Sequence, residues 1–257
     1  MDDLKQPLEN SPAPKPHDSG KIFCILFQRT GTKSLGGFFR DHGFQVATFR
    51  DSFRNGWTKS WFRGDFEAIF ASERFQSCSV FEDDPWWCGD FYKYLFHRFP
   101  DAKFVLFMRD PDSWFRSMIS HSKGKTLGNT YIHAHLYRRE EEYRESLDGD
   151  GLQELYSGKI DNLLPLSEKH RSAYTAIYRS RNSDIVEFFR ENGPDRLFVA
   201  RLEDHDKWIR LGKFLGIEVD EAYDSHLHKS AAAGGAKTVS SRWLPKFLSR
   251  REKPNKT

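Results

Sequence analysis

The amino-acid sequence predicts an α/β fold of three layers, in which helices cover both faces of a central parallel sheet. Four short segments, 21–27, 77–81, 102–108 and 196–200, have the length and apolar content of strands buried inside such a sheet. Segments whose apolar residues recur at helical spacing separate them. Because strands that alternate with helices pair in parallel, this alternation predicts the fold class.

The composition is that of one globular domain. The chain has 257 residues, a formal net charge of +3 and 15% aromatic residues, among them 23 phenylalanines. This aromatic content is too high for a disordered chain, and the length is sufficient to bury a large core. No run of about 18 apolar residues predicts a membrane span. The near-neutral charge argues against a dedicated nucleic-acid-binding protein.

The predicted domain covers residues 21–241. Residues 1–20, rich in proline, serine and charge, predict a flexible leader and lack the pattern of a secretory signal. The polar segment 121–165 predicts an inserted helical region that could form a lid over a site. The basic segment 242–257 predicts a frayed tail.

The three cysteines, Cys24, Cys78 and Cys88, are odd in number and have no C-x-x-C spacing. They therefore predict neither a disulfide framework nor a zinc site, and they fit a reducing compartment. Together with the missing signal pattern, this leads us to expect a cytoplasmic protein.

The first strand leads through a short loop into a helix, and the second ends in an acidic turn. Leu35, Phe38 and Phe39 lie at helical spacing after the loop. The strand at 77–81 runs into Glu-Asp-Asp-Pro, and residues 88–99 carry an apolar helical face.

The strand at 102–108 is the most clearly apolar, and Pro111 suits the first turn of the helix that follows it. A long helix is expected over 167–191 before the strand at 196–200. The last amphipathic helix ends at Gly216.

The loop after the first strand has the features of an anion site. Ligands of parallel α/β sheets bind beyond the carboxyl ends of the strands, where a helix N-terminus favours phosphate or sulfate. Gly31 permits close approach of the backbone. Hydroxyl and cationic side chains surround it: Arg29, Thr30, Thr32, Lys33 and Ser34.

A nucleoside-triphosphate loop is the obvious alternative. Its motif is G-x-x-x-x-G-K-[ST], and Lys33 with Ser34 could supply the end. Phe27 and Thr32, however, stand where the motif requires glycines. ATP or GTP binding of that type is therefore not expected.

Two segments carry a resemblance to the sulfotransferase superfamily. The strand–loop–helix at 28–32 resembles the loop that binds the 5′-phosphosulfate of the donor 3′-phosphoadenosine 5′-phosphosulfate (PAPS). The strand ending in Arg109, with Ser117 eight residues later, is similar to the family's 3′-phosphate site. The resemblance implies a P-loop NTPase-like sulfotransferase fold, PAPS as donor and 3′,5′-bisphosphoadenosine (PAP) as product.

Weaker similarities follow downstream, so that the resemblance spans about 21–230. The segments 178–189 and 202–216 are similar to a helix before the fourth strand and to a C-terminal helix of the family. The segment 226–230 resembles the basic loop that closes over the nucleotide, which implies a nucleotide-binding role for Lys229.

Sulfuryl transfer requires a cation at the leaving phosphate and a base at the acceptor. Arg29 and Lys33 are the candidate cations, and the sequence leaves open which is the main one. Asp83, two residues before Pro85, is the preferred base. Its neighbour Asp84, and Asp51 after the first helix, are the alternatives to it.

The acceptor is expected to be a small molecule or a sugar, and the oligomeric state is open. His121, His133 and His135 include an H-x-H spacing, but no carboxylate or cysteine pattern accompanies it, so no metal is expected. The competing hypotheses are a magnesium- and ATP-dependent phosphotransferase that uses Lys33 and Ser34, and a non-catalytic nucleotide- or partner-binding relative.

Overall fold

The computed structural model describes residues 20–126, 130–146 and 164–224. The chain divides into two compact units, Met1–Leu227 and His228–Thr257, and all described residues belong to the first. Lys229 and the predicted tail lie outside the described residues, as do nearly all of the predicted leader and part of the predicted insertion.

A five-stranded sheet forms the centre of the described unit, with the strand order β2-β3-β1-β4-β5. Every neighbouring pair is parallel, and Phe23 lies in register with Phe81 on one side and with Phe104 on the other. The predicted α/β class is thereby confirmed. The strands are β1 (Ile22–Cys24), β2 (Val46–Ala47), β3 (Val80–Phe81), β4 (Lys103–Met108) and β5 (Leu197–Arg201).

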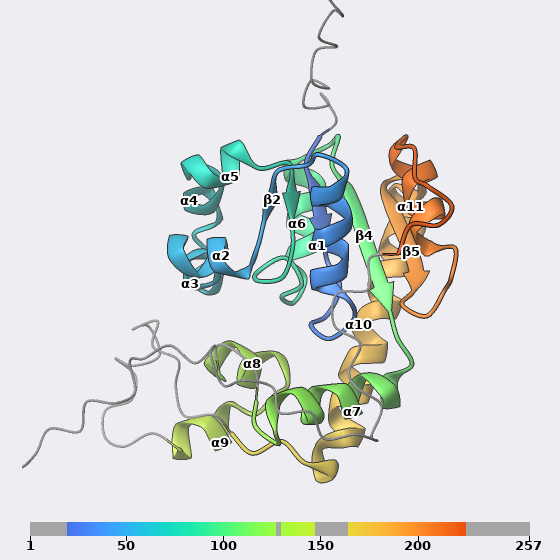
Figure 1. Ribbon diagram of the computed structural model, residues 1–257. Helices are drawn as coiled ribbons and strands as arrows, with labels where there is room; N and C mark the ends of the chain where they lie inside the picture. Colours follow the sequence, from blue (N-terminus) through green and yellow to red (C-terminus); the bar gives the residue numbers. More distant parts are fainter. Residues whose placement is uncertain (1–19, 127–129, 147–163, 225–257) are drawn as a thin grey trace, which may run out of the picture. The chain divides into compact units, whose positions relative to one another are not determined.

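Helices cover both faces of the sheet (Figure 1). Successive side chains of a strand point to opposite faces, and β4 illustrates this. Phe104 packs on Phe189, with 4.8 Å between ring centroids, whereas Phe107 packs on Trp208 at 5.5 Å. The helices of these layers are α1 (Thr32–Asp41), α6 (Phe91–Arg98), α10 (Arg171–Asn192) and α11 (Lys207–Leu215).

Four short helices that the sequence pattern did not indicate connect β2 to β3. Ser72 begins the last of them, since its hydroxyl accepts a hydrogen bond from the backbone N–H of Phe75. This helix extends to Ser77, so the predicted strand at 77–81 begins only at Val80. The four are α2 (Phe49–Asn55), α3 (Trp57–Phe62), α4 (Phe66–Phe70) and α5 (Glu73–Ser77).

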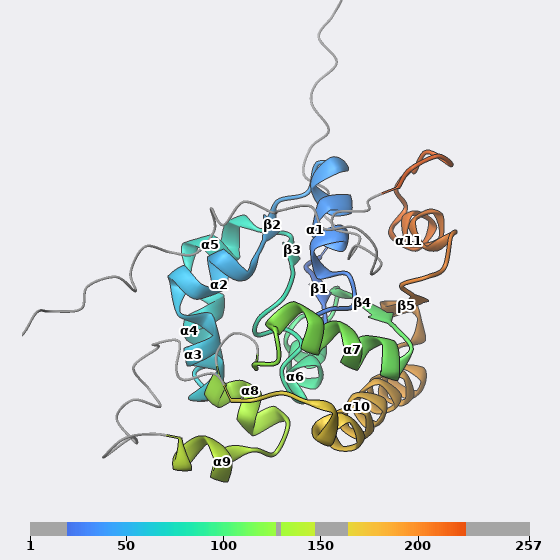
Figure 2. The ribbon, with the colours of Figure 1, turned by 60° about the horizontal axis from the view of Figure 1, so that its bottom comes forward.

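Three helices lie beyond the carboxyl ends of the strands (Figures 1 and 2). The first begins as predicted, with Asp110 accepting from the N–H of Ser113 at 2.9 Å and Pro111 in the first turn. They are α7 (Pro111–Ser122), α8 (Thr130–Leu136) and α9 (Glu140–Glu145). Short 3-10 turns at Glu168–His170 and Pro194–Arg196 precede α10 and β5.

Aromatic residues make up much of the core. Phe23 in β1 contacts Phe81, Trp86 and Phe104, with ring centroids 5.2–5.7 Å apart. A second cluster lies beneath the loop that follows β1 and is built around Phe27. Within the described ranges, no helix has both the length and the apolar character to cross a bilayer.

Candidate anion-binding and transfer site

The loop between β1 and α1 has an unusual backbone. Thr30 folds back on Phe27, whose carbonyl accepts from both its N–H and its hydroxyl. Arg29 has φ 68°, a left-handed conformation that is strained for residues other than glycine. Gly31 has φ 99°, and a Cβ there would lie 2.7 Å from Leu202 Cδ1, so the loop requires glycine at this position.

The N-terminus of α1 is open toward an anion. Gly31 caps it without a side-chain hydrogen bond, and the described first turn contains no acidic residue. The first N–H groups of a helix have no partner within the helix, and its dipole favours negative charge there. Lys33 is exposed on this turn, while Thr30 and Thr32 are buried.

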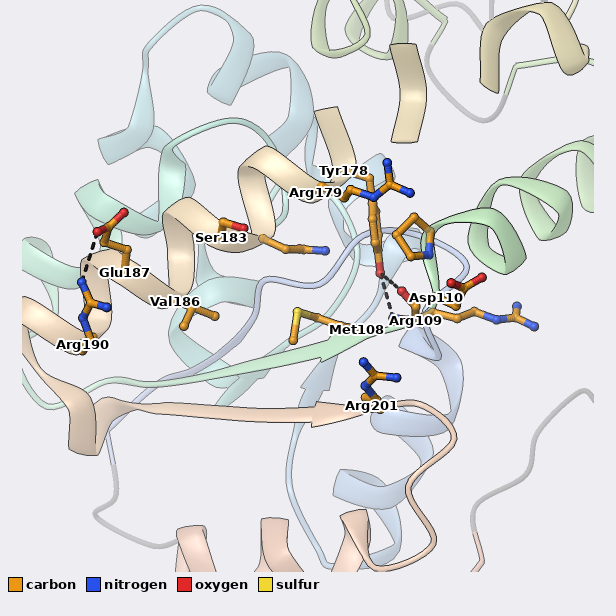
Figure 3. Close-up of a pocket in the computed structure, with 12 residues that line it drawn as sticks. Met108, Arg109, Asp110, Tyr178, Arg179, Ser183, Val186, Glu187, Arg190 and Arg201 are labelled. Atoms are coloured by element: carbon orange, nitrogen blue, oxygen red, sulfur yellow. Dashed lines mark hydrogen bonds and ion pairs between the residues drawn. The ribbon is translucent and has the colours of Figure 1, made fainter. Parts of the chain in front are cut away.

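Arg109 follows directly after β4 and is held by α10. The Tyr178 hydroxyl accepts from the Arg109 N–H at 2.8 Å and donates to the Arg109 carbonyl at 3.2 Å (Figure 3). Trp114 stacks on the Tyr178 ring, with 4.3 Å between centroids. The Glu203 carboxylate lies 3.3 Å from Arg109 Nε, but Nε lacks hydrogen-bond geometry to any described partner.

The loop after β1 and helix α7 meet at Arg29 and Ser117. Arg29 Nε donates to Ser117 Oγ at 3.2 Å. Burial, and then the positive charge of Arg109, lower the pKa of the Arg29 guanidinium. The positive charges of Arg29 and Arg109 repel each other, and a bound anion near both would offset this repulsion. The residues therefore fit a group that carries negative charge at both ends, such as a nucleotide bisphosphate.

Three consecutive carboxylates follow β3. Asp83 is half-buried, has φ 69° and accepts from the N–H of Asp84 at 3.0 Å. Burial raises the pKa of Asp83, although the Asp84 N–H and the charge of Lys33 oppose the rise. Asp84 is buried and accepts from the Trp87 indole; burial and the charge of Asp83 raise its pKa too.

Glu82 is the third of these carboxylates, and sequence reasoning assigned it no role. Only 5% exposed, it lies against Gly36 of α1, where any Cβ would overlap the carboxylate. Its Oε1 is 4.0 Å from Arg40 Nη1. Burial raises the pKa of Glu82 to about 8, and the charge of Asp83 acts in the same direction.

Asp51, one alternative base, has other partners. Its carboxylate caps α2 through the N–H and hydroxyl of Thr48 and pairs with Arg74 at 2.7 Å. Burial by itself would raise the pKa of Asp51, but the hydrogen bonds from Arg74 and Thr48 bring it below its usual value. A carboxylate in this state is a weak proton acceptor.

A pocket of about 510 Å³ begins at Arg109 and runs along α10 (Figure 3). Its walls come from the end of β4, the start of α7, one face of α10 and the end of β5. Val186 is an exposed apolar residue on this wall. Asn182 is a buried polar residue, and its Oδ1 has no hydrogen-bond partner among the described residues. Arg179 and Arg201 add positive charge.

The histidines of the H-x-H spacing do not converge. His133 is buried with its Nε2 3.0 Å from the Tyr174 hydroxyl, and burial lowers its pKa to about 3. His135 pairs with Glu140 at 3.0 Å. The described part of the chain holds no group of three or more histidine, cysteine or acidic residues arranged for a metal ion.

Comparison with known proteins decides the family. The family profile described as a sulfotransferase domain matches residues 21–231. The chain belongs to this sulfotransferase domain family. Searching curated proteins finds no match. Among solved structures, a sulfotransferase from Alicyclobacillus acidocaldarius is similar with a TM-score of 0.43 and 12% identity, over 82% of this chain and 87% of that one.

Membership of the sulfotransferase domain family supports sulfuryl transfer as the general chemistry, with the chain as a transferase. The structure brings Arg29, Arg109 and Ser117 together, as the two sequence motifs would require. It also reveals Tyr178, the first residue of the segment 178–189, as the residue that holds the end of β4. Glu82 carried no sequence signal beyond its place in an acidic turn.

Proposed function

We propose that this sulfotransferase moves the sulfuryl group of PAPS to a hydroxyl or amine of a small-molecule or carbohydrate acceptor. The observation that carries the proposal is the contact between Arg29 and Ser117, 88 residues apart in the sequence. It unites the motif that resembles a 5′-phosphosulfate loop with the motif that resembles a 3′-phosphate site.

In this proposal the donor lies along the carboxyl ends of β1 and β4. The 5′-phosphosulfate occupies the loop at 28–34 and the N-terminus of α1, and the 3′-phosphate binds Arg109 and Ser117. Arginine suits this role because its planar group can donate two hydrogen bonds to a phosphate and stays charged. The pocket beside Arg109 has the volume of a small-ligand site and would take the nucleoside. A nucleotide-binding role for Lys229 rests on the family resemblance of segment 226–230 alone, because Lys229 lies outside the described residues.

PAPS supplies the sulfuryl group and leaves as PAP. Arg29, assisted by Lys33, stabilises the charge that develops on the oxygen between sulfur and the 5′-phosphate. The acceptor oxygen or nitrogen forms a bond to sulfur as this older bond breaks. Asp83 takes the proton that the acceptor loses. Fixed cations in a site that excludes water contribute several kcal/mol to such steps.

Asp83 is preferred over its neighbours as the base. Burial raises its pKa, which strengthens it as a proton acceptor, and its side chain is half-buried, whereas Asp84 is buried. The Asp84 carboxylate already accepts a hydrogen bond from the Trp87 indole, and the Asp51 carboxylate accepts one from Arg74. The left-handed backbone of Asp83 matches that of Arg29, and such strain is concentrated at functional sites.

Calorimetric titration tests the donor assignment. The purified protein is titrated with PAP, with ADP and with ATP–magnesium. We expect PAP to bind tightly and ADP, which lacks the 3′-phosphate, to bind weakly. Preference for ATP–magnesium would favour a phosphotransferase that uses Lys33 and Ser34. Absence of binding by all three would favour a non-catalytic relative, as would PAP binding without transfer to any acceptor.

A further inference from the structure

Helix α10 places an arginine behind the phosphate loop. Arg181 is only 9% exposed. Its Nη1 donates to the carbonyl of Ile25 at 3.0 Å, and its Nε donates to the carbonyl of Gly89 at 3.2 Å. One side chain from α10 thus contacts two separate segments at the carboxyl end of the sheet.

The surroundings of this cation are aromatic rather than acidic. The guanidinium lies 5.0 Å from the ring centroid of Phe27 and 5.9 Å from that of Tyr92. Nη2 is buried without a hydrogen-bond partner among the described residues, and no ion pair to Arg181 is found there. Burial lowers the pKa of Arg181 to about 10. Burying a cation without a counter-ion is costly, so packing alone does not explain an arginine here.

The two carbonyls lie in the segments that carry the proposed chemistry. Ile25 bonds through its N–H to Val105 of β4 at 3.0 Å, and its carbonyl faces Arg181 at the point where β1 leads toward Arg29. Gly89 lies in the series of turns that starts at Asp83, whose carbonyl accepts from Trp86 at 3.1 Å, and that leads into α6. Arg181 therefore bridges the exit of β1 to the acidic turn.

We propose that Arg181 is a positioning residue, which holds the phosphate loop in the arrangement that receives the 5′-phosphate of the donor. The proposal rests on the proposed function, because it assumes that this loop binds that phosphate. Removing the guanidinium leaves the buried Ile25 carbonyl and the partly buried Gly89 carbonyl without this donor. The exit of β1 then relaxes, and the loop N–H groups and Arg29 lose their alignment.

The test compares two ligands that differ only in the 5′-phosphate, namely PAP and adenosine 3′-monophosphate. Their affinities are measured by calorimetry for the wild type, Arg181→Lys and Arg181→Met. We expect both variants to reduce the ratio of the two affinities about tenfold, the worth of one charged hydrogen bond. Affinity for adenosine 3′-monophosphate should fall less than affinity for PAP, because Arg181 reaches Ser117 only through the loop and Arg29.

Arg196 provides the matched control. It also donates to backbone carbonyls, those of Ala102, Phe96 and Phe99, and its guanidinium lies 3.9 Å from the Phe96 ring centroid. These contacts lie at the opposite, amino-terminal end of β4. Arg196→Met should lower the melting temperature yet keep the wild-type affinity ratio.

The outcomes separate the inference from the proposed function. If the wild type binds both ligands equally, the proposed 5′-phosphate site is wrong. If the wild type discriminates and both folded Arg181 variants discriminate equally well, the positioning role is wrong. A parallel loss of both affinities would also overturn it, since that indicates general destabilisation. Arg181→Lys keeps the charge and serves as the test where Arg181→Met does not fold.

Discussion

Arg29 and Ser117 are joined by a hydrogen bond of 3.2 Å, although one lies in the loop after β1 and the other on α7. Ser117 thereby takes part in ordering the loop cation before any ligand is present. In the proposed donor site Arg29 belongs to the 5′-phosphate subsite and Ser117 to the 3′-phosphate subsite. Their hydrogen bond therefore links the two subsites directly. Loss of either group should therefore be felt at both ends of the donor.

Replacing Arg109 tests the 3′-phosphate assignment. A hydrogen bond to a charged group contributes about 1.5–3 kcal/mol, so Arg109→Ala should weaken PAP binding roughly 10- to 100-fold. Calorimetry measures the change. Arg116→Ala is the control, since Arg116 is exposed on α7, the helix that follows Arg109, and its described hydrogen bond is to Ser113. Unchanged PAP affinity in Arg109→Ala would reject the assignment.

The two candidate cations are separated by comparing turnover with binding. Arg29 is half-buried beside Ser117, whereas Lys33 is exposed on the first turn of α1. We expect Arg29→Ala to reduce the rate of PAP release from PAPS, in the presence of an acceptor found by screening, more than it reduces PAP affinity. Lys33→Ala should show the smaller rate loss. The reverse order would make Lys33 the main catalytic cation.

The base is tested by neutralising single carboxylates. Asp83→Asn keeps the shape of the side chain but cannot take a proton, so it should abolish transfer while PAP affinity stays near the wild-type value. Asp84→Asn and Asp51→Asn should retain measurable transfer in their folded fraction. Full activity of Asp83→Asn would transfer the role to one of these two.

Glu82 should make stability depend on pH. Burial raises its pKa from 4.5 to about 8, so between these values the folded state holds a proton that the unfolded state has released. Stability from this group is therefore complete below about pH 4.5 and is lost as the pH rises toward 8. Glu82→Gln, which stays neutral, should melt at least about 2 °C above the wild type at pH 8.5 and lose this advantage at pH 4.5. An advantage that is equal at both pH values would show that the charge is not responsible.

Asp51 should have the opposite pH dependence. Its pKa in the folded state is below 3.8, because hydrogen bonds from Arg74 and Thr48 outweigh burial. This contribution is present above 3.8 and is lost as the pH falls through the lower folded value. Asp51→Asn should therefore melt at a lower temperature than the wild type at pH 7, and the difference should narrow in acid. A difference that stays constant down to pH 2.5 would contradict the ion pair.

Local patterns determined most of the framework. The continuous apolar run ending at Met108 became β4, and Pro111 lies in the first turn of α7, as predicted. By contrast, β2 has only two residues, too few to show a strand pattern in the sequence. They form a strand because Val46 pairs with Val80 of β3 in the folded sheet. Helices α2 to α5 have five to seven residues, too few to show a clear period.

Spacing along the chain singled out Arg29, Arg109, Ser117 and Asp83, because phosphate loops, strand ends and helix starts are local features. Only the tertiary structure decided that Arg29 meets Ser117, that Glu82 is buried under α1, and that Arg181 reaches β1 from α10. The reason is physical: residue type and spacing are encoded locally, whereas burial, charge proximity and hydrogen-bond partners depend on how distant segments pack together.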